Sequence, residues 1–293
     1  MLESLINPKR AERKPWEMFF IGLLYASVSL LIVDWIFLKD TVLSQYVSIL
    51  IVTFTVMCSM PFFYFIIRME EIKDVQIGEE RILIKEHGKA IAALIYLFMG
   101  FVIAFAFWYI VLPSGITSQN FKAQVEQYCA INSPDDFARC VGNVGVKDTI
   151  TGNAVVTGGM AYQMRHFVDI LVNNLYVLVF TLIFSLTFGA GAIFILAWNA
   201  SVIAAAIGIF TEASLHHFHM GIMRYFIHGI PEISAYFVGA LAGGIISVSI
   251  IRHDFKDDKF WKVLQDSVDL IIVAIIILVI SAFIEVFITP SLF

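Results

Sequence analysis

One stretch of the sequence places ionisable residues inside an otherwise apolar run. In RYFIHGIPEISAYFVGALAGG, His228, Pro231 and Glu232 come directly before a series of small residues. A charged side chain deep in a bilayer is penalised by roughly 2.5–3.5 kcal/mol on insertion scales. Such a group is therefore retained either to bind a proton, an ion or a small solute, or to form hydrogen bonds between helices. The sequence leaves both alternatives open.

The composition indicates that these residues are positioned by membrane helices. Of 293 residues, 59% are hydrophobic and only 15% are charged, which is far more apolar than a soluble domain. We expect an all-α polytopic integral membrane protein with about seven transmembrane helices. The runs long enough to cross a bilayer are Met18–Leu38, Tyr46–Ile67, Ala90–Leu112, Ile170–Phe188, Gly191–Phe210, Tyr225–Ile251 and Val268–Ile288. The fourth and fifth are separated only by the turn FGAG. If they formed one long helix, every later span would cross the membrane in the opposite direction.

The basic residues predict the orientation. With the N-terminus inside, 13 of the 19 lysines and arginines fall on the cytoplasmic side, as the positive-inside rule favours. The C-terminus is then outside, and the protein is expected as a multi-pass protein of the cell membrane. The first span is too long for a cleaved signal peptide and carries Asp34, so we expect it to be retained. The net charge of −5, without a basic stripe, argues against a nucleic-acid partner.

Three regions are expected along the chain. Residues 1–112 form a three-helix membrane region with a cytoplasmic amphipathic loop at 68–89, residues 113–167 a small loop-rich cap outside, and residues 168–293 a four-helix membrane core. Cys129 and Cys140 both fall in the cap, where an oxidising compartment would let them form a disulfide, while Cys58 is alone in the second span. Two reduced, unrelated thiols are the alternative.

Depth arguments gather the polar membrane residues into one layer. Pro231 is expected as the first residue of the sixth span, with His228 just before the helix. The other intramembrane polar residues expected in the outer half of the bilayer are Glu285, Asp34 and Asn174, with Asp169 and Asn173 beside Asn174 and with Asn199 nearer the middle. His228, Glu232 and Glu285 are predicted to be near neighbours. Exposure of several such groups to lipid would be unfavourable, so the helices should be bundled around them.

Small residues recur every four positions after Glu232. The series is Ala235, Gly239, Gly243 and Ser247, a small-xxx-small pattern that lets two membrane helices approach closely. Because Glu232 lies on the same face, its side chain is expected to point into protein rather than into lipid.

Catalytic and cofactor motifs are absent from the sequence. There is no HExxH, GxSxG or phosphate-binding glycine loop, and the last span has no lysine for a retinal Schiff base. We expect neither an enzyme nor a cofactor. In HHFHM, His216 and His219 share a helical face and are weak metal candidates, with interfacial histidines in a solvated loop as the alternative.

The second half of the chain resembles a known family. VNNLYVLVF, FGAGAIFILAWNA, HGIPEISAYFVGALAGG and IEVFITP, in this order over about residues 165–290, look like the membrane core of the stage II sporulation protein M family. Ile227 and Ala200 stand where a proline and a glycine are frequent in that family.

The resemblance implies a membrane scaffold or assembly protein of the cell envelope without catalytic activity of its own. In endospore formers, the family member belongs to a membrane-anchored machine with peptidoglycan-degrading partners. The expected partners are therefore the lipid bilayer and other membrane or envelope proteins, and a homo-oligomer stays open. The alternative is a transporter or channel that uses the His/Glu site for a proton, ion or small solute. A wide, wet, outward-open cavity reaching Asn199 would favour transport, whereas a closed and dry contact would favour the scaffold.

Overall fold

The computed structural model describes residues 14–76, 83–132, 136–144, 160–188, 192–211, 215–251 and 258–292. Every regular element in these ranges is a helix. This is the expected solution for so apolar a chain, because an α-helix satisfies its own backbone hydrogen bonds where no water is present.

Seven of the described helices are long and apolar enough to cross a membrane, so the expected all-α polytopic architecture is confirmed. They are α2 (Glu17–Phe37), α3 (Val47–Gln76), α4 (Leu83–Val111), α8 (Met160–Phe188), α9 (Ala192–Phe210), α10 (Phe218–Ile251) and α11 (Asp258–Phe283). The fourth and fifth spans are separate helices. A π-helical turn, η5 (Ile284–Ile288), and the short α12 (Thr289–Leu292) follow α11.

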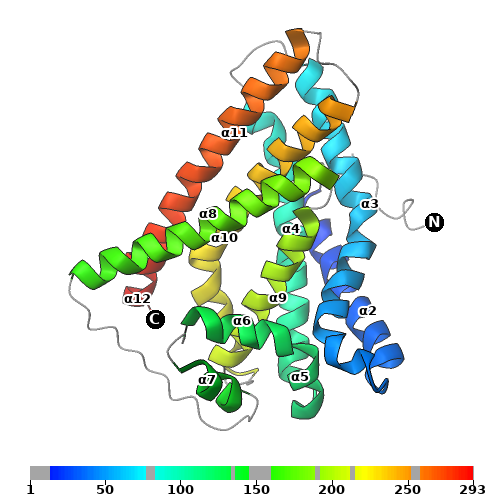
Figure 1. Ribbon diagram of the computed structural model, residues 1–293, viewed down its shortest axis with the longest axis vertical. Helices are drawn as coiled ribbons and strands as arrows, with labels where there is room; N and C mark the ends of the chain where they lie inside the picture. Colours follow the sequence, from blue (N-terminus) through cyan, green and yellow to red (C-terminus); the bar gives the residue numbers. More distant parts are fainter. Residues whose placement is uncertain are drawn as a thin grey trace.

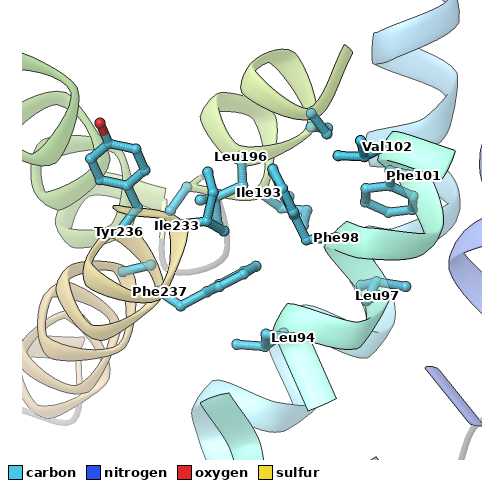
Figure 2. Close-up of a cluster of buried hydrophobic side chains, with 14 of the residues drawn as sticks. Leu94, Leu97, Phe98, Phe101, Val102, Ile193, Leu196, Ile233, Tyr236 and Phe237 are labelled. Carbon is cyan, nitrogen blue, oxygen red and sulfur yellow. The ribbon is translucent and has the colours of Figure 1, made fainter. Parts of the chain in front are cut away.

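The helices pack around α4 and α10. Helix α4 lies between α2 and α9, α10 lies between α8 and α11, and α8 crosses the molecule obliquely (Figure 1). Large side chains fill the space where α4, α9 and α10 meet, among them Phe98 and Phe237, whose rings pack edge to face at 6.2 Å (Figure 2). Since lipid tails are as apolar as these side chains, close packing rather than water exclusion holds such a core together.

The described part of the predicted cap is helical rather than loop-rich. It contains α5 (Ser114–Asn120), α6 (Lys122–Asn132) and α7 (Phe137–Val144), which lie at the same end of the molecule as α12 (Figure 1). These helices have 7, 11 and 8 residues, too short for the helical period to stand out among the polar residues. At the same end, a 3₁₀ turn, η2 (Leu43–Tyr46), joins α2 to α3.

The sixth span begins earlier than expected. Helix α10 starts at Phe218, so Pro231 lies within it instead of at its first position, and His228 is helical. Proline removes one backbone hydrogen bond from a helix, but membrane helices tolerate it where neighbouring helices and side chains supply polar partners.

The predicted amphipathic loop at 68–89 is also different in the structure. Helix α3 continues to Gln76 and α4 begins at Leu83, so much of this segment extends the two spans. Glu70 and His87 are fully buried there. In the part of this segment whose side chains the structure describes, the two helix ends contact each other through Glu70 and His87.

Candidate functional site

Helix α10 presents its polar side chains towards the end of the last span. His228, Glu232 and Tyr236 follow one another at four-residue intervals, which places them on one face of the helix. In the segment that follows α11, Glu285 lies in the π turn η5 and Thr289 begins α12. We call His228, Glu232, Tyr236, Glu285 and Thr289 the α10–η5 cluster.

His228 is held from two sides. Its backbone carbonyl accepts a hydrogen bond of 2.7 Å from the Ser281 hydroxyl of α11, and its Nδ1 lies 3.4 Å from Thr289 Oγ1. Its Nε2 lies 4.0 Å from Glu285 Oε1, which is longer than a hydrogen bond and within the range of a charge contact. The His228 side chain is 11% exposed and that of Glu285 31%, so the cluster is buried at the histidine and reaches the surface at the glutamate.

The Glu232 carboxylate accepts a hydrogen bond from a residue of its own helix. The Tyr236 hydroxyl donates a hydrogen bond of 2.8 Å to Glu232 Oε1. In Figure 2 the oxygen of Tyr236 points away from the apolar cluster in which its ring is packed. Glu232 and Glu285 lie close enough to interact electrostatically. The structure therefore brings together the three residues that the depth argument grouped, His228, Glu232 and Glu285.

The π turn at Glu285 has a local cause. Pro290 has no backbone N–H, so the helix cannot continue with regular i to i−4 hydrogen bonds through this position. The Thr289 backbone N–H bonds the Ile284 carbonyl, five residues back, and the Thr289 hydroxyl adds a hydrogen bond of 3.2 Å to the same carbonyl. Single π turns of this kind recur at functional sites, and here the turn carries the carboxylate that faces His228.

The other predicted polar residues have partners of their own. Asp34 Oδ2 accepts a 3.0 Å hydrogen bond from Asn120 of α5, so it joins the first span to the cap. Asn174 of α8 is buried beside Asn173, whose amide donates to it at 3.4 Å. Asn199 bonds the Ile195 carbonyl of its own helix. The level of Asp34 in the membrane thus did not indicate that its partner is in the cap.

Three residues around the cluster were missed from the sequence. The Tyr225 ring lies 6.2 Å from that of His228, and the Tyr225 side chain is hydrogen-bonded to Tyr128 of α6. Arg224 acts electrostatically on both tyrosines. Burial raises the pKa of Tyr128, against the lowering effect of the Arg224 charge, so this phenol is neutral at pH 7. The four-residue interval from Arg224 to His228 and Glu232 was the signal that could have included the arginine.

The small-residue stripe of α10 packs against α8. A side chain at Gly239 would collide with the Leu178 side chain, and one at Gly243 would meet the Leu182 carbonyl at 3.0 Å. Ala235 and Ser247 are buried on the same stripe. The Ser185 hydroxyl of α8 donates a hydrogen bond of 2.5 Å to the Ala240 carbonyl. Close backbone approach thus positions the face of α10 that carries the cluster.

The sequence analysis also missed a buried pair of side chains, Glu70 near the end of α3 and His87 near the start of α4. His87 Nδ1 lies 2.6 Å from Glu70 Oε2, and both side chains are fully buried. The pair joins two neighbouring spans near the end of the bundle away from the cap. No spacing rule connects residues 17 positions apart in two different helices, so only the fold could reveal it.

The cap is fixed to the bundle by its own polar contacts. Cys129 and Cys140 form a disulfide between α6 and α7, the pairing that the sequence predicted. Gln124 of α6 donates hydrogen bonds of 3.2 Å to the Ser48 carbonyl of α3 and to the Ser201 hydroxyl of α9. The cap therefore joins α3 and α9 at one end of the bundle.

The metal candidates lie at the start of α10 and just before it. His216 and His219 are exposed, and the His216 ring packs on that of His217 at 5.2 Å. Within the described ranges, no three His, Cys, Asp or Glu side chains form a group that could hold a metal ion. A pocket next to Tyr225, between α4, α9 and α10, is lined by apolar side chains and has a volume of about 10 Å³, room for roughly one water molecule. Asn199 does not line it.

Seven spanning helices, a disulfide-closed cap and an intramembrane polar cluster define a polytopic membrane protein. The chain belongs to the family described as Stage II sporulation protein M, whose model matches residues 92–290. The match begins in α4 and includes the cap, so it is longer than the stretch of residues 165–290 expected from the motifs. An uncharacterized protein of the archaeon Methanocaldococcus jannaschii is 36% identical over 132 residues, which cover 43% of this chain and 72% of that protein. No solved structure matches the chain.

Proposed function

We propose that the protein is a noncatalytic membrane scaffold of the cell envelope, which holds partner proteins through its cap and its helical bundle. Family membership supports this proposal. The observation that carries it is the closure of the polar cluster by its own members. Tyr236 bonds Glu232, Thr289 contacts His228, and the neighbouring pocket is apolar and no larger than about one water molecule. On this proposal, the ionisable residues fix the register of α10 against the last span.

The docked cap supplies the surface for partners. Its helices are anchored to α2, α3 and α9 through Asn120 and Gln124 and closed by the disulfide. Ile131 and Phe137 remain 54% and 41% exposed on it. A rigid support with exposed apolar side chains is suited to binding another envelope protein, because less entropy is lost when an ordered surface binds.

A transporter of protons or cations is the second candidate. The observation that favours it is the pair of interacting carboxylates, of which Glu285 reaches the surface while His228 is buried behind it. Intramembrane ionisable residues commonly form such relays. The two candidates differ in what Glu232 must do: a scaffold needs its hydrogen bond, whereas a relay needs its charge.

The substitution Glu232→Gln separates the two candidates. An amide oxygen can still accept the Tyr236 hydroxyl, so we expect the purified variant to fold as the wild type does. We would reconstitute both proteins in liposomes with an internal pH-sensitive or cation-sensitive dye and apply a gradient. In host membranes, we would cross-link the cap through a photoreactive residue at position 131, with Phe137→Ala as the variant that weakens partner contact.

The scaffold predicts no gradient-driven flux and cross-linked products that Glu232→Gln leaves unchanged and Phe137→Ala reduces. A flux through the wild-type protein that Glu232→Gln abolishes would overturn the scaffold and support the relay. Ser234→Ala is the matched control on the same helix, because the exposed Ser234 hydroxyl bonds the Ile230 carbonyl of its own turn.

A further inference from the structure

Helix α8 differs from the other spans in how little of it is covered. Of its most apolar stretch, 17% is buried, the smallest share among the seven candidate spans in the described ranges. It runs obliquely across α10, and both of its ends lie within the length of the bundle, short of the cap helices at one end and of the start of α11 at the other (Figure 1). The outer face of α8 is therefore placed along the middle of the bundle rather than at its ends.

This outer face carries charged and polar side chains. Arg165, Asp169 and Asn173 follow one another at four-residue intervals, and all three are exposed. In the part of the chain that the structure describes, neither Arg165 nor Asp169 forms an ion pair. The opposite face of α8 is occupied, because the Phe167 ring packs on that of Phe287 in η5 at 6.4 Å. The three polar side chains therefore point away from their own bundle.

Helix α2 shows the composition of a lipid-facing span in this protein. Its exposed side chains are all apolar, namely Phe20, Leu24, Val28, Leu31, Ile32, Trp35 and Ile36. Charged residues inside a span, by contrast, almost always face protein or pair with one another. The outer face of α8 thus fits a protein surface that offers a carboxylate to Arg165 and a cation to Asp169.

A second copy of the chain supplies both of these complements. All copies have the same orientation in the membrane, so a two-fold axis between two of them lies along the membrane normal, and contacts across it are reciprocal. When Arg165 of one copy meets Asp169 of the other, a second identical pair forms by symmetry. The Asn173 amide adds a donor and an acceptor on the same face. This self-complementary arrangement favours a second copy over an unrelated protein.

We propose that the outer face of α8 is the interface of a homodimer, held by two reciprocal pairs of Arg165 and Asp169. The pairs remove both charges from contact with lipid, and the apolar residues farther along the same face, such as Val172 and Val179, extend the contact. The proposal goes beyond the scaffold function and does not depend on it, because a transporter could form the same dimer.

Charge reversal tests the two pairs. Arg165→Asp and Asp169→Arg each place like charges opposite one another, whereas the double variant restores opposite charges with their places exchanged. We would measure the dimer-to-monomer ratio of each full-length protein by native mass spectrometry from a mild detergent, with circular dichroism melts to confirm folding. We expect each single reversal to lower the ratio by about tenfold, the factor for about 1.4 kcal/mol, and the double variant to recover it. Asp269→Arg, at an exposed carboxylate of α11, is the matched control and should dimerise as the wild type does.

Cross-linking in membrane vesicles locates the interface. Val168 lies between the two charged residues in the sequence and is 48% exposed, so their pairing brings it close to Val168 of the other copy. In the Cys58→Ser protein, Val168→Cys should therefore give a dimer with a bifunctional maleimide, whereas Val28→Cys, on the exposed face of α2, should give none.

Four results would overturn the proposal. A folded double variant that is no more dimeric than the single reversals would show that the charges do not pair between copies. A dimer formed through Val28→Cys alone would place the interface on α2. A monomeric wild type without a Val168→Cys product would leave the outer face of α8 to lipid, and a Val168→Cys product with a different protein would identify another partner.

Discussion

At the scale of single residues, the contact between Glu70 and His87 is one whose loss should strongly destabilise the fold. The two atoms lie 2.6 Å apart and neither side chain is exposed. Removal of one partner leaves a buried polar group without its mate, which destabilises proteins by about 3–5 kcal/mol. We therefore expect Glu70→Ala to lower the melting temperature in detergent strongly, and Glu70→Gln to lower it less because an amide oxygen still accepts a hydrogen bond.

The exposed pair of Asp136 and Arg139 is the matched control. Its atoms lie 2.9 Å apart, but the side chains are 58% and 75% exposed, and such pairs contribute roughly 0–1 kcal/mol. Asp136→Ala should melt close to the wild type. Equal melting temperatures for Glu70→Ala and Asp136→Ala would show that the buried contact contributes no more to stability than the exposed ion pair.

A second residue gives a pH-dependent prediction outside the spans. The backbone N–H groups of Leu43 and Val42 each donate a 2.8 Å hydrogen bond to Asp40, and they hold the pKa of this carboxyl below its ordinary value of 3.8. A depressed folded-state pKa gives stability that is present above pH 3.8 and is lost as the pH falls through the folded pKa.

Asp40→Asn keeps an oxygen acceptor and removes the titration. We expect the melting temperature of the wild type to exceed that of the variant at about pH 6, and the difference to shrink towards about pH 3. Circular dichroism melts in one detergent across this range would measure it. A difference that stays constant with pH would contradict the assignment of the hydrogen bonds to the charged carboxylate.

At the scale of elements, a glycine contact sets the distance between α2 and α4. A Cβ at Gly100 would collide with the Phe19 carbonyl oxygen and lie 2.9 Å from the Gly22 Cα. Because these are backbone atoms, a methyl group there can only push the helices apart, and overpacking of this kind costs about 1–3 kcal/mol. We expect Gly100→Ala to lower the melting temperature.

Helix α4 contains its own control for this prediction. A Cβ at Gly88 would meet nothing within 4 Å, and alanine has a higher helix propensity than glycine by about 1 kcal/mol. Gly88→Ala should therefore melt at or above the wild-type temperature. If both alanine variants melted above the wild type, α2 and α4 would not be in backbone contact at Gly100.

The same contact explains what the sequence could and could not predict. The spans were predictable because length and apolarity alone determine them, and the α10 stripe was predictable because four small residues recur within one helix. Gly22 and Gly100 lie in two different helices, and the single alanine four residues after each of them, Ala26 and Ala104, does not indicate which helices pair. Pairing of Glu70 with His87 likewise depends on how α3 and α4 pack. Pro231 was misplaced because a start rule for isolated helices was applied to a helix with packed neighbours.

At the scale of the whole molecule, the cap gathers contacts from three spans. Asn120 reaches α2, and Gln124 reaches both α3 and α9. Sequence depth arguments assigned Asp34 to the carboxylate site, whereas its partner is in the cap, because a residue's level along the membrane normal does not fix its position around the bundle. The cap and the C-terminal α12 share one end of the molecule (Figure 1), so the side on which the cap lies decides the orientation of all seven spans.

The disulfide offers a direct test of that orientation. Positive-inside counting predicts that the cap is outside, where oxidising conditions preserve the Cys129–Cys140 bond. Intact cells expressing the Cys58→Ser protein, which lacks the free cysteine, would be treated with a membrane-impermeant thiol reagent before and after an impermeant reductant. We expect no labelling before reduction and labelling afterwards, first at the partly exposed Cys140 and more slowly at the buried Cys129. Cys140→Ser should leave Cys129 unpaired and remove the dependence on reduction. If labelling needed permeabilised cells under every condition, the cap would face the cytoplasm, and all seven spans would be inverted relative to the orientation that the basic residues predict.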